Sequence, residues 1–148
     1  NRTVGLMEWP GRFPKPVRTP VPAAHQDVFP TVVAATGASV ARPHPLDGAN
    51  LLPVLDGTTT TRPPLGFLLW NGKGNFDKVD FVADVQGVWV DGNLKLVADP
   101  KGAAPRLYDI YADPAHKTDL AATMRAALDE WRRGVRASYD GKDYAAKE

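Results

Sequence analysis

The sequence predicts an α+β fold in which a small antiparallel sheet is packed by a C-terminal amphipathic helix. The clearest local signal is a hairpin: the alternating segments 88–90 and 94–97 flank Asp91-Gly92, a pair that supplies the positive φ angles of a type I′ turn. The helix is indicated by apolar residues that recur every three or four positions from about residue 119. They are Leu120, Met124, Leu128, Trp131 and Val135. Because a helix buries its apolar face against another element, we expect this one to lie across the sheet.

Three further segments are predicted strands that would complete the sheet in meander order. Residues 65–70 form a continuous apolar run, and residues 71–75 are too rich in glycine to continue it. The other two predicted strands are residues 106–111 and residues 79–85.

The first half of the chain is rich in proline and glycine and is predicted to consist mainly of loops. Val4–Trp9 is short and mostly apolar, and Pro10-Gly11 stops it, which predicts a buried strand ending in a turn. Residues 13–22 then form an extended, proline-rich connector. Residues 51–55 can make at most one helical turn before the polar loop at 58–61.

A short helix is predicted over residues 28–36. Asp27 is a good N-cap, Pro30 falls in the first turn where its missing N–H costs little, and Gly37 suits a left-handed C-terminal residue. One face carries three apolar residues at the helical spacing and is expected to be buried. They are Phe29, Val32 and Val33.

Bulk composition excludes several function classes. The 18 basic and 17 acidic residues give a formal net charge of +1, so no global field favours nucleic acid or an anionic membrane as a partner. Without cysteine the chain has no disulfide, thiolate metal site or cysteine nucleophile. No apolar run approaches the roughly 20 residues of a membrane span. The start of the chain also lacks the features of a signal peptide.

No metal site is predicted from the residues. The three histidines, His25, His44 and His116, lie in separate loops without the spacing of metal ligands. Several aspartates adjoin glycine or proline, where a role in a turn is the default. They are Asp47, Asp56, Asp91 and Asp113.

Three stretches, in the same order, resemble the C-terminal third of sulfatases, part of the alkaline phosphatase superfamily. Asn1–Gly11 is similar to a Gly-Gly-x-Arg segment followed by a strand ending in Trp-Pro-Gly, and His25–Thr31 to an Asp-x-x-Pro-Thr helix start. Leu46–Leu55 is similar to a Leu-Asp-Gly-x-Ser-Leu-Leu-Pro-Leu-Leu element.

The third stretch lies in the last third of the chain. Asp91–Val97 is similar to a Trp/Tyr-Lys-Leu strand, Leu107–Pro114 to a Leu-Tyr-Asp-Leu-x-x-Asp-Pro strand and turn, and Asp119–Ala121 to the start of a long terminal helix. The departures are Asn50 for Ser, His116 for Glu, and Leu94 for an aromatic residue.

The resemblance implies residues 1–61 as the tail of a large α/β sulfatase domain and residues 62–148 as a small C-terminal subdomain of antiparallel sheet plus helix. It also implies a formylglycine, made from Cys or Ser in a Cys/Ser-x-Pro-x-Arg motif, and a calcium ion held by Asp and Asn side chains. The chain contains neither that motif nor an Asp-Asp pair near its start. We therefore expect no catalytic residue and no metal ligand in it, and no turnover of sulfate esters by this chain alone.

Four residues are candidates for substrate binding. Trp70, Trp89 and Lys95 could contact a sugar or aryl group, because the small domain of the resembled family contributes to one wall of the pocket, although packing and solvent exposure is the simpler interpretation. Arg2 matches the Arg after Gly-Gly, where a structural ion pair is the alternative.

The leading hypothesis is the C-terminal part of a sulfatase that hydrolyses sulfate esters, with a missing N-terminal sulfatase segment as one partner and a sulfated small molecule or glycan as the other. A phosphonate monoester or phosphodiester hydrolase of the same superfamily is the alternative among enzymes, and a non-catalytic binding or assembly module is the alternative outside them. Location in the periplasm or outside the cell follows only by analogy with the family.

Overall fold

A computed structural model describes residues 4–40, 45–70, 72, 75–100, 103–111 and 118–143. The described residues form two compact units: the first contains residues 4–40 and 46–62, and the second contains Pro45 and the described residues from Pro63 onward. Each unit is described by itself below. Among the described residues, no helix combines the length and the apolar character needed to cross a membrane.

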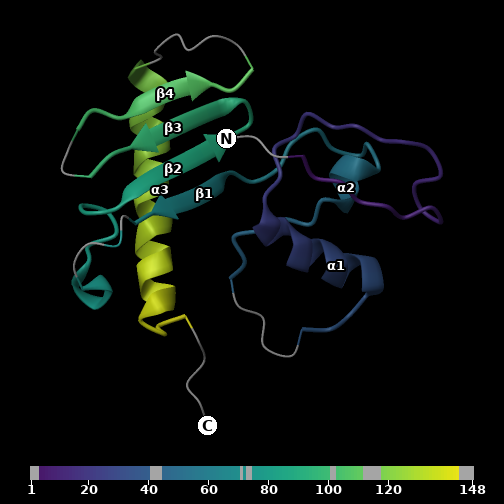
Figure 1. The fold of residues 1–148 in the computed structure, drawn as a ribbon, viewed down its shortest axis with the longest axis horizontal. Coiled ribbons are helices and arrows are strands. Elements are labelled where there is room, and N and C mark those ends of the chain that lie inside the picture. Colours follow the sequence, from purple (N-terminus) through teal and green to yellow (C-terminus); the bar gives the residue numbers. More distant parts are fainter. Residues whose placement is uncertain are drawn as a thin grey trace. The chain divides into compact units, whose positions relative to one another are not determined.

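The second unit contains the predicted antiparallel sheet, and the α+β fold class is confirmed. Its four strands are paired in the order β1-β2-β3-β4, which is the meander order expected for hairpin-connected strands. They are β1 (Leu65–Leu69), β2 (Gln86–Asp91), β3 (Leu94–Ala98) and β4 (Arg106–Asp109). Helix α3 (Thr118–Tyr139) crosses one face of this sheet (Figure 1).

The predicted hairpin forms, but its turn lies one residue further along the chain. Asp91 pairs with Leu94 across the ladder, so the two loop residues are Gly92 and Asn93 rather than Asp91 and Gly92. Gly92 has φ 56°, the left-handed region that a two-residue hairpin turn requires. Aspartate remains in the strand because its backbone completes the last pair of the ladder.

Helix α3 and the sheet share one apolar core. Leu96 and Leu128 are both fully buried, and Trp131 lies against the backbone of Gly66, where an added Cβ would come within 2.5 Å of the indole. The other buried members of this core are Ala98, Leu107, Ala121 and Met124. The predicted apolar stripe is therefore confirmed at Met124, Leu128 and Trp131, whereas Val135 is half-buried and Leu120 is 44% exposed at the start of the helix.

Two of the predicted strand segments end or fold differently. The last strand stops at Asp109, because the Asp109 carboxylate accepts a hydrogen bond from the backbone N–H of Tyr111 at 2.9 Å and turns the chain. Residues 79–85 are not a strand: the Asp80 carboxylate accepts from the N–H groups of Val82 (2.8 Å) and Ala83 (3.1 Å) and closes a turn. Local side-chain hydrogen bonds thus replaced the ladder expected from the apolar pattern.

The first unit contains the short helix α1 (Val28–Thr36), preceded by the 3₁₀ turn η1 (His25–Asp27), and the single turn α2 (Leu52–Leu55). Gly37 ends α1 with φ 68°, as predicted. Asp27 stands before α1, but its side chain makes no N-cap hydrogen bond to that helix. It serves the 3₁₀ turn instead, because it accepts from the N–H of Ala24 at 2.7 Å.

The prediction of a buried face at Phe29, Val32 and Val33 is wrong for the first two residues. Phe29 and Val32 are each 52% exposed, and the buried residue of α1 is Thr31. The helix is oriented by hydrogen bonds from Thr31 to the segment before α2, so its polar side faces the rest of the unit and its most apolar side faces outward.

The predicted buried strand at Val4–Trp9 is also absent. These residues form neither helix nor strand, and Val4 and Leu6 are 81% and 93% exposed. A strand requires a neighbour for its backbone hydrogen bonds, and no strand within the described ranges pairs with this segment. The turn predicted at Pro10-Gly11 does form, closed by hydrogen bonds to the carbonyl of Trp9.

Two glycine-to-alanine substitutions should change stability in opposite directions. Gly92→Ala is expected to destabilise the protein by about 1 kcal/mol, because alanine is strained at a positive φ. Gly134→Ala, in the middle of α3 with open space around its Cα, should stabilise it by about 0.5–1 kcal/mol through helix propensity. Urea unfolding followed by circular dichroism measures both. A shift of the same sign in the two variants would contradict the assigned hairpin turn or the helix.

Candidate functional site

A buried carboxylate connects three segments of the first unit. Asp27 is fully buried and accepts hydrogen bonds from the backbone N–H of Ala24 at 2.7 Å, from that of Ala49 at 2.8 Å, and from the Arg62 guanidinium, whose Nη2 lies 2.9 Å from Oδ1. A second, shorter contact joins Nη1 of Arg62 to Oδ2. Three segments far apart in sequence therefore meet at one side chain.

Electrostatics favour the ionised form of this carboxylate. Burial alone would raise the pKa of Asp27, but the hydrogen bond from Arg62 and those from the N–H groups of Ala49 and Ala24 outweigh burial and leave the pKa below its ordinary value. The side chain of Arg62 is only 5% exposed, so the pair is screened little by solvent. A buried pair of this kind is costly to break.

A second contact joins the same segments. The Thr31 hydroxyl accepts a hydrogen bond from the N–H of Leu51 at 3.0 Å and lies 3.5 Å from the carbonyl oxygen of Ala49. Gly48 passes so close to the preceding turn that an added Cβ would lie 1.9 Å from the carbonyl oxygen of Gln26. We call Asp27, Thr31, Gly48 and Arg62 the Asp27 clasp, and its role in this unit is structural.

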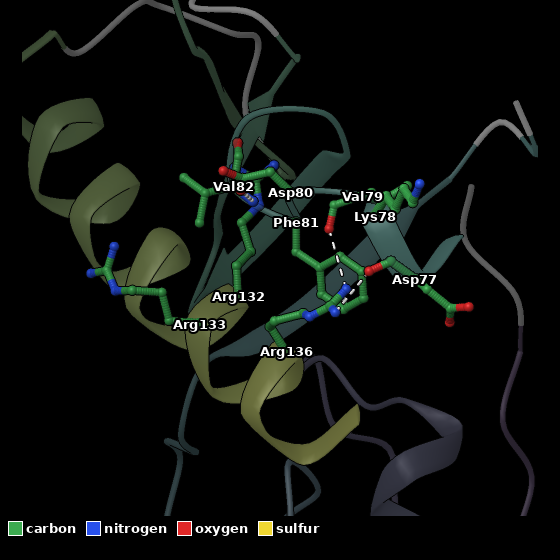
Figure 2. A pocket seen from close by; sticks show the side chains of 9 residues that line it. All are labelled: Asp77, Lys78, Val79, Asp80, Phe81, Val82, Arg132, Arg133 and Arg136. Atoms are coloured by element: carbon green, nitrogen blue, oxygen red, sulfur yellow. Dashed lines mark hydrogen bonds between the residues drawn. The ribbon is translucent and has the colours of Figure 1, made fainter. Parts of the chain in front are cut away.

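The second unit contains a pocket between α3 and the connection from β1 to β2 (Figure 2). Arg132 is fully buried and donates hydrogen bonds to the carbonyls of Val82 (3.1 Å), Val85 (2.7 Å) and Ala98 (3.3 Å). Its guanidinium also pairs with Asp129 at 2.9 Å. Burial lowers the pKa of Arg132, and the hydrogen bond to Asp129 opposes that change.

Arg136 lies one helical turn further along α3 and continues the same contact. It donates to the carbonyls of Val79 (3.3 Å) and Asp77 (2.9 Å), as the dashed lines in Figure 2 show. Its guanidinium also stacks over Phe81 at 5.4 Å from the ring centroid. Together, Arg132 and Arg136 hold a segment that has no ladder of its own against the helix.

Four aromatic residues form a cluster in this unit, and one of them, Phe81, lines the pocket. Phe76 is their centre: its ring centroid lies 4.9 Å from that of Trp70, 5.1 Å from that of Tyr139 and 5.3 Å from that of Phe81. The Tyr139 hydroxyl donates to Asp77 Oδ1 at 2.6 Å, which raises the pKa of Tyr139 above its ordinary value. Trp70 and Tyr139 remain 37% and 49% exposed.

The chain is similar in sequence to several curated sulfatases. Arylsulfatase D of Homo sapiens is 39% identical over 56 residues, which is 38% of this chain and 9% of that protein. Choline-sulfatase of Rhizobium meliloti (strain 1021) is 29% identical over 110 residues, 74% of this chain and 20% of that protein. Arylsulfatase G of Rattus norvegicus is 38% identical over 61 residues, 41% of this chain and 12% of that protein. This chain is sulfatase-like.

The resemblance predicted from the motifs is therefore confirmed, and it is partial in extent. The sulfatase-like chain spans between 9% and 20% of the length of these three relatives. No family model matches it. Among solved structures, a phosphonate monoester hydrolase of Agrobacterium radiobacter is 27% identical in sequence, with a TM-score of 0.36. The match covers 78% of this chain and 23% of the hydrolase chain.

The residues of the sulfatase-like chain do not fit the calcium and formylglycine that the resemblance implies. Within the described ranges no three His, Cys, Asp or Glu side chains gather as metal ligands, and the sequence has no Cys/Ser-x-Pro-x-Arg motif from which a formylglycine could be made. The buried carboxylate of Asp27 is occupied by Arg62 and two backbone N–H groups. We derive no catalytic step from this chain.

The predicted substrate-binding residues of the sulfatase-like chain lie apart from one another. Arg2 is outside the described residues. Trp70 packs against Phe76 with ring centroids 4.9 Å apart, whereas Trp89 packs against Trp131 of α3 with ring centroids 6.1 Å apart. Lys95 adjoins the buried Leu96 in β3, so alternation along the strand places it on the sheet face opposite to α3. Among the three of these residues that the structure describes, no two are therefore brought together.

Sequence reasoning missed the side chains that shape the pocket. Arg132 and Arg136 follow the buried Leu128 at intervals of four residues, so they lie on the same side of α3 as the core. Tyr139 lies three residues after Arg136. This spacing indicates that both arginines lie on the core side of the helix. Arginine is rarely buried without a partner, however, and the partners here are backbone carbonyls that no sequence pattern indicates.

Proposed function

We propose that this chain is the C-terminal part of a sulfatase that hydrolyses sulfate esters, and that it contributes fold stability and one wall of the substrate cleft. The observation that carries the proposal is the sequence similarity to arylsulfatases and a choline-sulfatase. Trp70 is our main candidate for the wall, because its ring is 37% exposed and packs on one side against Phe76, and Lys95 is the second.

A further sulfatase segment is the proposed partner of the first unit. Val28, Phe29 and Val32 of α1 are 61%, 52% and 52% exposed, and Val4 and Leu6 are more exposed still. Burying such residues contributes about 25 cal/mol per Å² of apolar surface removed from water. An α/β sheet would cover the exposed apolar face of α1 and would give the exposed apolar segment at residues 4–9 a strand to pair with.

In this proposal the nucleophile and the metal ion belong to the rest of the enzyme. The chemistry that a formylglycine and a calcium ion would supply is therefore assigned to no residue of this chain. The chain alone is therefore predicted to be inactive. Its contribution is to complete the fold and to present side chains to the organic part of the ester.

The decisive experiment is to measure the intact mass of the native gene product and to assay it with 4-nitrophenyl sulfate and with a phenylphosphonate monoester. A longer product that contains Cys/Ser-x-Pro-x-Arg and hydrolyses the sulfate ester supports the proposal. Preference for the phosphonate would favour the related hydrolase instead. A product of this length with no activity on either substrate would overturn both and favour a non-catalytic module.

The proposed partner surface has its own test in the native gene product. Phe29→Glu is expected to reduce activity and thermal stability, because it places a charge on the surface that the further segment would cover. Ala34→Glu is the matched control, since Ala34 is exposed on α1 away from Phe29 and Val32. Equal effects of the two variants would argue against a covered surface at Phe29.

A further inference from the structure

The sheet of the second unit has two edge strands, and the two edges differ in how they are protected. Strand β4 carries features that normally block pairing with another chain: Pro105 precedes it, and the charged residues Arg106 and Asp109 begin and end it. Strand β1 lies at the other edge (Figure 1) and has the sequence Leu-Gly-Phe-Leu-Leu, without a charge or a proline. The β1 edge is therefore the one that favours pairing with a further strand.

The outer side of β1 has no backbone partner within the described ranges. Its ladder runs to β2 alone, and the backbone of Leu65–Leu69 forms no hydrogen bond with any other described residue. A strand carries N–H and C=O groups on both sides, so those on the outer side of β1 are left to water or to another strand. Leu69 and Trp70, 54% and 37% exposed, add apolar surface at the end of this edge.

The sequence of β1 is complementary to itself in an antiparallel arrangement. A two-fold axis between the Phe67 residues of two copies pairs Leu65 with Leu69 of the second copy. The same axis pairs Gly66 with Leu68 of the second copy. Among the two-fold registers, this one pairs all five residues of the strand. Because β1 is uncharged, no like charges meet across the axis.

The side chains at this junction would be in apolar contact on both faces of the sheet. Alternation along the strand places Gly66 and Leu68 on the α3 face and Phe67 on the other face. Gly66 lies under the indole of Trp131, where an added Cβ would come within 2.5 Å of the ring. In the pair, Leu68 of the second copy comes beside Gly66 and therefore next to this indole. On the other face, the two Phe67 rings meet at the axis.

We propose that β1 is a homodimer interface, at which two copies of this protein pair their β1 strands antiparallel about Phe67 and join their sheets into one. The assembly closes as a dimer, because each copy has one such edge and the β4 edge is protected by charge. One strand pair is small beside the about 1,200–2,000 Å² of stable interfaces, so association is expected at micromolar concentration. The inference goes beyond the proposed function and does not depend on hydrolysis.

The test is the mass of the native gene product in solution, measured by light scattering and native mass spectrometry between about 1 and 100 µM. Wild type is expected to become dimeric toward the upper concentration. Phe67→Lys should weaken dimerisation at least about tenfold, because the two lysines would face each other across the axis. Tyr108→Lys is the matched control, since Tyr108 is half-buried on the same sheet face but in β4, and it should leave the dimer intact.

A mixture of variants separates a lost interface from a lost fold. Phe67→Glu alone should be monomeric, whereas Phe67→Glu mixed with Phe67→Lys should form a hybrid dimer, because a carboxylate then faces an ammonium group. Failure to form the hybrid, or a dimer that Phe67→Lys leaves unchanged, would overturn the proposal.

Hydrogen exchange of the wild type tests the interface without any variant. The amides of β1 should exchange more slowly at the high protein concentration than at the low one, and those of β4 should exchange equally at both. A wild type that stays monomeric, or β1 amides that exchange equally at both concentrations, would overturn the proposal. Hydrolysis of 4-nitrophenyl sulfate by the same preparation is scored separately: its absence counts against the proposed enzyme and leaves the dimer standing.

Discussion

Arg132→Ala is expected to destabilise the second unit by about 3–5 kcal/mol, a large part of the stability of an ordinary domain. The substitution leaves three carbonyls without their donor, those of Val82, Val85 and Ala98. It also removes the partner of Asp129 at 2.9 Å and leaves a cavity where a fully buried side chain stood. Each unsatisfied buried carbonyl costs about 1–3 kcal/mol, so even partial access of water leaves a large effect.

Urea unfolding followed by tryptophan fluorescence measures this change. Arg133→Ala is the matched control: the side chain is 59% exposed and pairs with Glu130, itself 77% exposed, so stability should change by no more than about 0.5 kcal/mol. Arg132→Lys should lie between the two, because it keeps a charge but cannot reach several carbonyls at once. If Arg132→Ala were as stable as Arg133→Ala, the buried contacts of Arg132 would not be holding the β1–β2 connection.

The same arginine explains a glycine inside a strand. An added Cβ at Gly87 would lie 2.4 Å from Nη2 of Arg132, and one at Gly66 would lie 2.5 Å from the indole of Trp131. Glycine normally weakens a strand interior. Here the two glycines let large side chains of α3 lie directly on the sheet, so the helix position and the strand composition depend on each other.

The parts of the fold with a repeating apolar pattern could be predicted from the sequence. Helix α3 and the hairpin of β2 and β3 were found because their periods of about 3.6 and 2 residues are local properties. The position of the turn was missed by one residue because both Asp91-Gly92 and Gly92-Asn93 suit a tight turn, and only the ladder register separates them.

The rest depended on partners distant in sequence. The apolar pattern of residues 79–85 predicts a strand. In the structure, the carboxylate of Asp80 and the guanidinium groups of α3 instead form hydrogen bonds with the backbone groups that a neighbouring strand would otherwise pair with. The sequence predicts the helix at Val28–Thr36 but not its orientation. Thr31 accepts a hydrogen bond from the segment before α2, so the polar side of the helix faces inward. Such contacts have no periodic signature, so the pocket beside Arg136 could not be assembled from the sequence.

The motifs that carried the sulfatase resemblance have a physical explanation in the first unit. Asp27, Thr31 and Gly48 belong to two separate motif stretches, and the structure joins them in the Asp27 clasp. These residues are therefore explained by the contacts that hold the first unit of this chain together, and those contacts say nothing about the chemistry. The proposed reaction depends on the similarity of the sequence to a part of several sulfatases, while the Asp27 clasp accounts for these residues without any substrate.

Asp27→Asn should destabilise the first unit by about 3–5 kcal/mol at neutral pH, because it leaves the guanidinium of Arg62, only 5% exposed, without its carboxylate. The control is Asp56→Asn, which removes the partner of Arg12 in a pair whose side chains are 30% and 37% exposed and should change stability little. Urea unfolding at pH 7 compares the two. An effect of Asp27→Asn as small as that of Asp56→Asn would contradict the clasp as the main connection of this unit.

The pH dependence provides a second and independent check on Asp27. Its pKa is lower in the folded protein than in the unfolded chain, where an aspartate carboxyl group titrates at about 3.9. The ionised carboxylate therefore contributes its full stabilisation above that value and loses it as the pH falls through the lower, folded pKa.

Asp27→Asn has no proton to gain at this position. The difference in unfolding free energy between wild type and variant should therefore be constant from pH 7 to about 5 and should narrow below about 4. The carboxyl groups of Asp56 and Asp140, whose pKa values are also lowered, are present in both proteins and cancel in the difference. A gap that stays constant down to pH 3 would mean that the charge of Asp27 does not stabilise the fold, and that its hydrogen bonds to Ala24 and Ala49 act equally well through a neutral side chain.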